Sequence, residues 1–235
     1  MKMNIYEKRA RVYPAIVAMV VPVIFTTVFF SGIIKQWLPS WAIALRILVA
    51  FVPVATVYAA LGYMSRELFR WTSKQLFQFP IFNEDETKMP TTRMLLWSDS
   101  SIPDESKKVL RQKIENKYGK QLYGKKQEEA KPKEAALVIA HVVRSIRQDT
   151  RDDKILLQYN YEYGFSRNYL GASIWAIAFI LIFWIVNAHS NVLPNSVFVI
   201  ALLCQVVLDL FVFVSMKHNA KAYARQLLAS FQSKY

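Results

Sequence analysis

The sequence is poor in the residues on which most catalytic and metal sites depend. Of its 235 residues, one is a cysteine (Cys204), three are histidines and six are glycines. A single cysteine excludes an intramolecular disulfide, and Cys204 lies in an apolar run, where inert packing is expected. The sequence also has no glycine-rich phosphate loop, no H-E-x-x-H pair, no Cys/His cluster and no G-x-S-x-G elbow. We therefore expect no catalytic residue, no metal site and no cofactor.

Acidic residues are scarce as well. Seventeen Asp and Glu face 30 Lys and Arg, which gives a formal net charge of +13. This excess favours polyanions or anionic membrane surfaces as neighbours. Hydrophobic residues make up 54% of the chain and charged residues 20%, which indicates a chain divided between a membrane and water.

Long apolar runs are present in four places, roughly residues 13–34, 41–63, 170–188 and 195–216. Each is about the 20 residues that a helix needs to cross the hydrocarbon core. Pro22 and Pro53 interrupt the first two runs and are expected to kink their helices. The sequence predicts an α-helical membrane protein with two pairs of transmembrane helices, in 13–63 and 169–216. A small cytosolic domain, mostly helical or α+β, is inserted between spans two and three.

Basic residues set the expected orientation. They gather in 1–12, 64–168 and 217–235, whereas the loop 187–195 has no Lys or Arg. The positive-inside rule places the three basic segments, and so both termini, in the cytosol. The tail 217–235 is expected to form an amphipathic helix, with an apolar face of Ala220, Tyr223, Leu227, Leu228 and Phe231.

Within the basic domain 64–168 the pattern predicts mainly helices. Residues 104–118 and 132–148 have helical apolar stripes, and Gly119 is placed as a C-terminal stop. Residues 93–97 are a strand candidate, and 154–161 form either a strand or a helical lead-in to span three. Residues 65–79 extend span two until Pro80 ends the helix. Residues 123–134 are predicted to be a charged, mobile linker.

Basic side chains in this domain suggest an anion site. Arg144, Arg147 and Arg151 fall at i, i+3 and i+7 of the helix expected over 133–150, and Arg167 and Asn168 follow near span three. Guanidinium groups bind phosphate oxygens through two parallel hydrogen bonds, so these five residues are predicted to bind an anionic ligand. The alternative is a solvated basic face that meets lipid headgroups, with neighbouring aspartates pairing part of its charge.

One carboxylate stands inside a predicted span. Asp209 is costly in a membrane helix and is expected to face a bundle interior or water, with Gln205 on the same face one turn earlier. The pair either lines a cation pathway in an oligomer or forms a polar clasp between helices. In span three, Gly171 and the Ala172–Ala176 pair permit close helix approach and suggest an oligomer face.

The junction before span three is unusually rich in aromatic residues. Tyr163, Gly164 and Phe165 precede the apolar run directly. Gly164 is expected to break the approach to the span, and Tyr163 and Phe165 to anchor it at the membrane interface. We interpret these three residues as a coupling element between the basic domain and the membrane helices; the alternative is an anchored junction that does not switch.

Two segments carry a resemblance to a known group of proteins. "MPTTRMLLWSDSSI" (89–102) and "YEYGFSRNYLGAS" (161–173) resemble bacterial four-span membrane proteins that accompany antiviral defence systems. The resemblance covers roughly residues 80–175. It implies a cytosolic sensing domain joined to a membrane effector in the bacterial inner membrane, and it carries no catalytic residue over to this chain.

These observations lead to a functional expectation. Four spans enclose no useful pore alone, so a pore requires a homo-oligomer, with a tetramer favoured. We expect membrane lipids as neighbours, and a cytosolic domain that senses a nucleotide, an oligonucleotide or a partner protein and gates an ion-conducting pore. The rival is a non-channel scaffold that recruits a cytosolic partner protein. A small transporter would need a midplane site, for which the sequence offers only Asp209.

Overall fold

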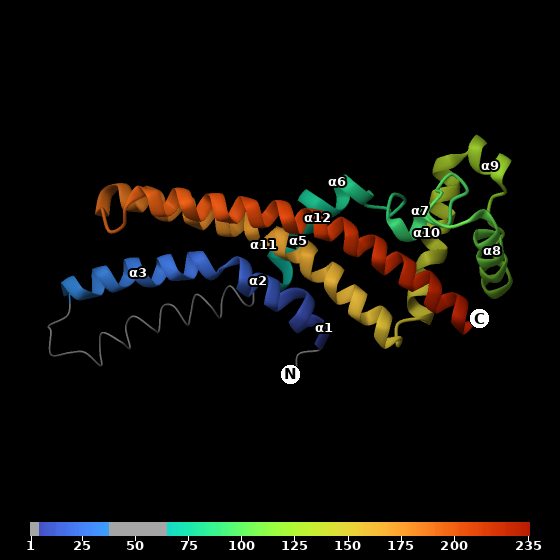
Figure 1. The fold of residues 1–235 in the computed structure, drawn as a ribbon, viewed down its shortest axis with the longest axis horizontal. Coiled ribbons are helices and arrows are strands. Elements are labelled where there is room, and N and C mark those ends of the chain that lie inside the picture. Colours follow the sequence, from blue (N-terminus) through green and yellow to red (C-terminus); the bar gives the residue numbers. More distant parts are fainter. Residues whose placement is uncertain (1–4, 38–64) are drawn as a thin grey trace. The chain divides into compact units, whose positions relative to one another are not determined.

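The computed structural model describes residues 5–37 and 65–235, with side chains for 5–31 and 67–235, and the regular secondary structure of this part is all helical (Figure 1). The longer helices are α3 (Val20–Trp37), α8 (Asp104–Tyr118), α10 (Pro132–Asp149), α11 (Lys154–Ser190) and α12 (Asn195–Lys234). The shorter ones are α1 (Ile5–Glu7), η1 (Lys8–Val12), α2 (Tyr13–Ala18), η2 (Ser65–Phe69), α5 (Arg70–Ser73), η3 (Lys74–Gln78), α6 (Phe79–Phe82), α7 (Pro90–Arg93) and α9 (Lys125–Ala130).

No strand occurs among the described residues, so the mostly helical alternative holds and the α+β alternative does not. The predicted strand at 93–97 is wrong, because Arg93 ends α7 and turns follow it, with Leu96 N donating to Arg93 O (2.9 Å). Residues 154–161 are the helical lead-in to α11.

Three helical stretches are long and apolar enough to cross a membrane: Ile5–Ser31, Lys154–Ser190 and Asn195–Lys234. These three stretches support the prediction that the chain is a membrane protein. The predicted span at 41–63, with Pro53, lies outside the described residues, and a total of four spans therefore stays a prediction.

The first of these stretches breaks where Pro22 requires it. Pro22 has no N–H to donate to the carbonyl of Ala18, one turn earlier. The helix is interrupted between those two residues, at Met19, whose ψ of 3° is not helical. Val23 N then donates to Met19 O (3.0 Å) and the helix resumes as α3.

The chain divides into two compact units. Unit 1 comprises 1–74 and 165–214, and unit 2 comprises 75–164 and 215–235. Helix α11 has one part in each unit, and so has helix α12.

Unit 2 has an apolar core built from α8, α10 and the end of α12. Its buried residues include Leu110, Ile114, Ile139, Val142, Val143, Ile146, Tyr223, Ala224, Leu227, Leu228 and Phe231. The predicted apolar faces of 104–118, 132–148 and the tail are confirmed, and Gly119 ends α8 in the left-handed conformation at φ 63°. The tail is the continuation of α12 rather than a separate helix.

One of the core clusters of unit 1, here called the small-residue core, contains several alanines. Ala172 and Ala176 are fully buried against Ala15, Ala18 and Phe69. A Cβ on Gly171 would lie 2.1 Å from Phe69 O and 2.6 Å from the Ser73 Cβ, so the segment 65–73 packs directly on the glycine. The small-residue face of α11 is therefore filled from within the chain.

Candidate functional site

The three predicted arginines of α10 occupy different environments. Arg147 donates to Glu86 Oε2 (2.7 Å) and to Thr91 Oγ1 (3.2 Å), so a ligand would have to displace both partners. Arg144 is exposed on α10. Arg151 lies beyond the last helical residue, Asp149, and pairs with Asp152 at 3.7 Å. The prediction of one continuous helical face with three arginines is therefore wrong. Of the three, Arg144 is the one that lies exposed on the helix.

Glu86 reaches Arg147 because its backbone is held in an unusual conformation. Its φ is 63°, in the left-handed region. The hydroxyl of Thr92 donates to the carbonyl of Glu86 (2.9 Å), and the amide of Met89 does so at 3.1 Å. The turn that precedes α7 thus presents one carboxylate to α10, where Arg147 neutralises it.

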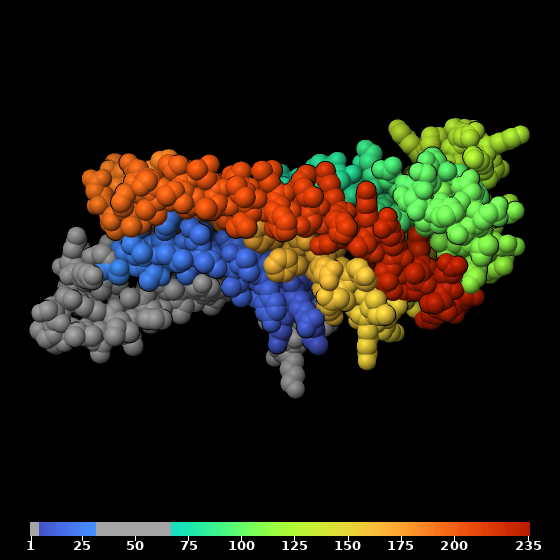
Figure 2. Space-filling view, in the orientation of Figure 1, coloured from blue at the N-terminus to red at the C-terminus, as the bar shows by residue number. Residues whose placement is uncertain are grey.

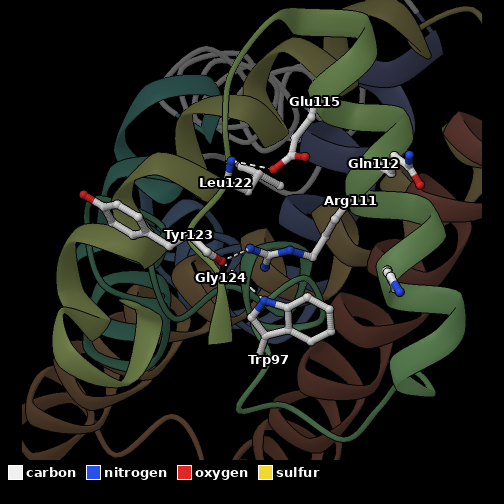
Figure 3. A pocket seen from close by; sticks show the side chains of 8 residues that line it. Trp97, Arg111, Gln112, Glu115, Leu122, Tyr123 and Gly124 are labelled. Atoms are coloured by element: carbon white, nitrogen blue, oxygen red, sulfur yellow. Dashed lines mark hydrogen bonds between the residues drawn. The ribbon is translucent and has the colours of Figure 1, made fainter. Parts of the chain in front are cut away.

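A pocket of about 300 Å³ lies in unit 2 between α8 and the chain around Tyr123 (Figure 3). The Arg111 guanidinium lies 4.8 Å from the Trp97 ring centroid and donates to Leu95 O (2.6 Å) and Tyr123 O. Trp97 Nε1 also donates to Tyr123 O (3.3 Å). The volume is at the lower end of small-molecule sites, and these hydrogen bonds hold the floor of the pocket in place.

Glu128 completes this arrangement from α9. One carboxylate oxygen accepts from Ser98 N (3.0 Å), and the other lies 3.8 Å from Arg111 Nη1. Burial lowers the pKa of the Arg111 guanidinium, and the charges of Glu128 and Glu115 oppose that effect. The prediction of a mobile linker at 123–134 is wrong here, since a buried carboxylate fixes α9 to the rest of unit 2.

Sequence reasoning missed this pocket. In "KKQEEA" the two glutamates are adjacent and look equally solvated, although Glu128 is buried and Glu129 is exposed. Helical spacing offers no signal, because α9 has only six residues. Trp97, next to a short apolar run, is the one sequence feature that could have drawn attention to this region.

The junction before span three is a continuous helix. Gly164 lies inside α11, so the predicted break at this residue is wrong. Tyr163 is buried rather than placed at a surface, and Phe165 packs against the small-residue core of unit 1. Since the division between the two units falls between residues 164 and 165, the coupling role of Tyr163, Gly164 and Phe165 stays a prediction.

Arg167 and Asn168 lie in unit 1 and are both buried. The amide of Asn168 donates to the carbonyl of Ala10. Asn168 therefore connects α11 to the N-terminal segment, which is a structural role that a ligand would have to replace.

A polar cluster lies between α11 and α12. Gln205 Nε2 donates to the Tyr169 hydroxyl (3.0 Å) and to Asp209 Oδ1 (3.1 Å). The Ser173 hydroxyl, which donates to Leu170 O (2.9 Å), also lies close to the Asp209 carboxylate. Gln205 is buried, whereas Asp209 is half-buried. The structure thus brings the two predicted pathway residues together and adds Tyr169 and Ser173, which sequence reasoning did not select.

The surroundings of this cluster are apolar and open. Along the same part of α12, the exposed side chains include Leu203, Val207, Leu210, Phe211 and Val214, and the orange part of α12 forms much of the visible surface in Figure 2. Cys204 is exposed on this helix as well, contrary to the expectation of a packed thiol. Asp209 is therefore a partly exposed carboxylate on a part of α12 whose other exposed side chains suit lipid.

Comparison of the chain with protein-family models, with curated proteins and with solved structures finds no match in any of the three. The function is therefore inferred from the residues of this chain and from their geometry.

Proposed function

We propose that the protein is an effector of the bacterial inner membrane, serving anti-phage defence, that conducts ions as a homo-oligomer. Unit 2, placed in the cytosol by the charge pattern, would receive a nucleotide, an oligonucleotide or a partner protein. The membrane helices of unit 1 would supply the pathway.

The observation that carries this proposal is the half-buried Asp209 with its partner Gln205. A carboxylate facing lipid costs several kcal/mol, and such residues face a bundle interior or water instead. A symmetric assembly would place several copies of Asp209 around one axis, while the large apolar side chains exposed beside it on α12 would face lipid. A ring of carboxylates is a common selectivity element of cation channels.

The proposal is tested in bacteria that express the chain with and without its genomic neighbours, with membrane potential followed by a voltage-sensitive dye. Depolarisation that Asp209→Asn alters would support conduction. Loss of the response in Arg144→Ala/Arg147→Ala, with unchanged protein levels, would support a signal received by unit 2. Lys133→Ala, which removes an exposed basic side chain from the same helix α10, serves as the matched surface control.

A second candidate is a scaffold that recruits a cytosolic partner protein. The pocket beside Trp97 favours it, because Arg111, Lys108 and Gln112 line an open cavity suited to an acidic side chain of another protein. An unchanged membrane potential under every trigger, together with a co-purifying neighbour protein that Lys108→Ala releases, would favour the scaffold over the pore.

A further inference from the structure

One side of helix α12 carries exposed basic residues and no acidic ones. Lys217, His218, Lys221 and Arg225 are all exposed. Positions one, four and eight residues after Lys217 lie on the same side of an α-helix as Lys217 itself. No Asp or Glu follows Asp209 in the sequence, so no acidic residue of α12 lies among them. The four exposed residues are here called the α12 basic stripe.

The opposite side of the same stretch fixes the orientation of the stripe. Five side chains there are buried: Met216, Ala220, Tyr223, Ala224 and Leu227. The last three belong to the apolar core of unit 2. A rotation of α12 that turned the stripe inward would expose this core and bury charge, and both changes cost free energy. The basic side chains therefore stay on the surface.

The part of α12 just before the stripe has an exposed surface suited to lipid. Val207, Leu210, Phe211 and Val214 are each between 63% and 70% exposed. The stripe begins three residues after Val214. The exposed side of α12 thus changes from apolar to basic within one helical turn, as expected where a helix leaves the hydrocarbon core.

Spacing along α12 places the stripe at the depth of lipid headgroups. Measured from the last exposed apolar residue, Lys217 lies about 5 Å further along the axis, Lys221 about 10 Å and Arg225 about 16 Å, since a helix rises about 1.5 Å per residue. The headgroup layer on each side of a bilayer is about 5–8 Å thick. Lys221 reaches that layer because a lysine side chain extends back toward the bilayer along its flexible stem. Arg225 lies further out, within about one Debye length of the lipid phosphates.

Two members of the stripe have no partner among the described residues. Neither Lys221 nor Arg225 forms an ion pair or a side-chain hydrogen bond within that part of the chain. Their charges are therefore available to an external anion. An exposed charge in water needs no partner, so the feature that selects a lipid is the position of the stripe directly beyond an apolar surface.

We propose that the α12 basic stripe binds the phosphate groups of anionic lipids in the cytosolic leaflet. Basic residues immediately beyond a transmembrane helix are attracted to anionic headgroups, and each Lys or Arg near the surface contributes about a fivefold gain in affinity. The cytosolic side follows from the charge pattern of the sequence. Lipid binding here fixes how deep α12 lies in the membrane, and this role is independent of ion conduction.

Photocrosslinking of the full chain in phosphatidylcholine bilayers tests the stripe. A photoreactive phosphatidylglycerol is present in trace amounts, and mass spectrometry identifies the labelled peptides. Segment 217–225 is expected to be labelled. Added unlabelled phosphatidylglycerol is expected to reduce this labelling, whereas the same amount of zwitterionic phosphatidylethanolamine is not. Loss of the label on addition of inorganic phosphate would identify a site for a soluble anion and overturn the proposal.

Lys221→Gln is the decisive variant and is expected to lower the labelling about fivefold. Arg225→Gln is expected to lower it less, because position 225 is further from the bilayer. Lys221→Arg keeps the charge and is expected to keep the label, which separates loss of charge from misfolding. Lys126→Gln/Lys133→Gln removes two exposed lysines elsewhere in unit 2 and is the control. Lipid binding by the stripe is refuted if the wild type stays unlabelled at 217–225, or if Lys221→Arg or the control loses the label as Lys221→Gln does.

Discussion

Gln205 donates to Asp209 one turn further along α12, at 3.1 Å, and through the same amide nitrogen to the hydroxyl of Tyr169 on α11, at 3.0 Å. A buried amide thus connects the one carboxylate of the predicted spans to the neighbouring helix. Such a cluster orients the carboxylate, because an amide nitrogen offers two donors and both are used here.

Access of water to position 209 follows from the proposed pathway. In a Cys204→Ser background, Asp209→Cys is expected to react with a water-soluble, membrane-impermeant thiol reagent. Val207→Cys, on the exposed apolar side of α12, is expected to react much more slowly because it would face lipid. Modification is measured by mass spectrometry of intact membranes. Equal protection of both positions would contradict a water-filled route past Asp209.

Close packing at Gly171 predicts a strong effect of one methyl group. Gly171→Ala would place a Cβ 2.1 Å from the carbonyl oxygen of Phe69, and overpacking of this kind costs about 1–3 kcal/mol. Gly124→Ala is the matched control, since its Cβ would meet only the Gln127 side chain at 3.8 Å. Thermal unfolding in detergent measures both. A Gly171→Ala chain as stable as the wild type would contradict the contact between α11 and residues 69–73.

The buried pair of Glu128 and Arg111 predicts a difference between two adjacent glutamates. Glu128→Gln leaves the Arg111 charge without its buried partner, and the free energy of unfolding is expected to fall by about 3 kcal/mol. Glu129→Gln, on the exposed side of α9, is expected to change it by less than about 0.5 kcal/mol. Urea unfolding, followed through Trp fluorescence, distinguishes them. Equal effects would indicate that α9 is the mobile linker that its charges suggest.

Alkaline pH is expected to weaken unit 2 through Tyr118. Burial raises the pKa of its hydroxyl, and the hydrogen bond to Asp149 Oδ2 (2.9 Å) raises it further. The folded chain therefore keeps this proton at pH values above about 10, where an unfolded tyrosine releases it. Because the unfolded state then binds fewer protons, stability falls as pH rises through that range.

Tyr118→Phe removes this contribution, so its unfolding midpoint should decline less steeply with alkaline pH than that of the wild type. Tyr159→Phe, a change of the same size on α11, is the matched control. Urea midpoints measured at several alkaline pH values give the slopes, and the ultraviolet absorbance of tyrosinate reports the titration. Identical slopes for the Tyr118→Phe chain and the wild type would show that the hydroxyl stays in water.

Periodic features of the fold were predictable from the sequence, and features set by single long-range contacts were not. The apolar faces of α8, α10 and the α12 tail follow a helical period, and Gly119 marks a helix end, so residues such as Ile114 and Phe231 were assigned correctly. The buried state of Glu128 depends on Arg111, seventeen positions away in the chain. No local pattern encodes that pairing, and the linker prediction failed for this reason.

The candidate sites show the same division. Gln205 and Asp209 share a helical face by spacing alone, and the structure brings them together. The hydroxyl of Tyr169 joins them from α11. In the sequence, Tyr169 resembles an aromatic anchor at the membrane interface. Arg147 had the helical spacing expected of a ligand-binding arginine, but Glu86 neutralises its charge. Glu86 lies in a turn, at φ 63°, that the sequence does not predict. Glycine is a residue that often breaks helices, yet α11 continues through Gly164 because its neighbours on both sides are helical.

We propose above all that oligomers of this chain conduct cations past Asp209. The most direct test of this proposal is the reversal potential of purified protein in planar bilayers under a KCl gradient, with Asp209→Asn beside the wild type. The wild type is expected to reverse near the potassium equilibrium potential, and the reversal potential of Asp209→Asn is expected to shift clearly toward zero as selectivity weakens. A membrane that stays non-conducting, or a conductance whose selectivity Asp209→Asn leaves unchanged, would contradict it.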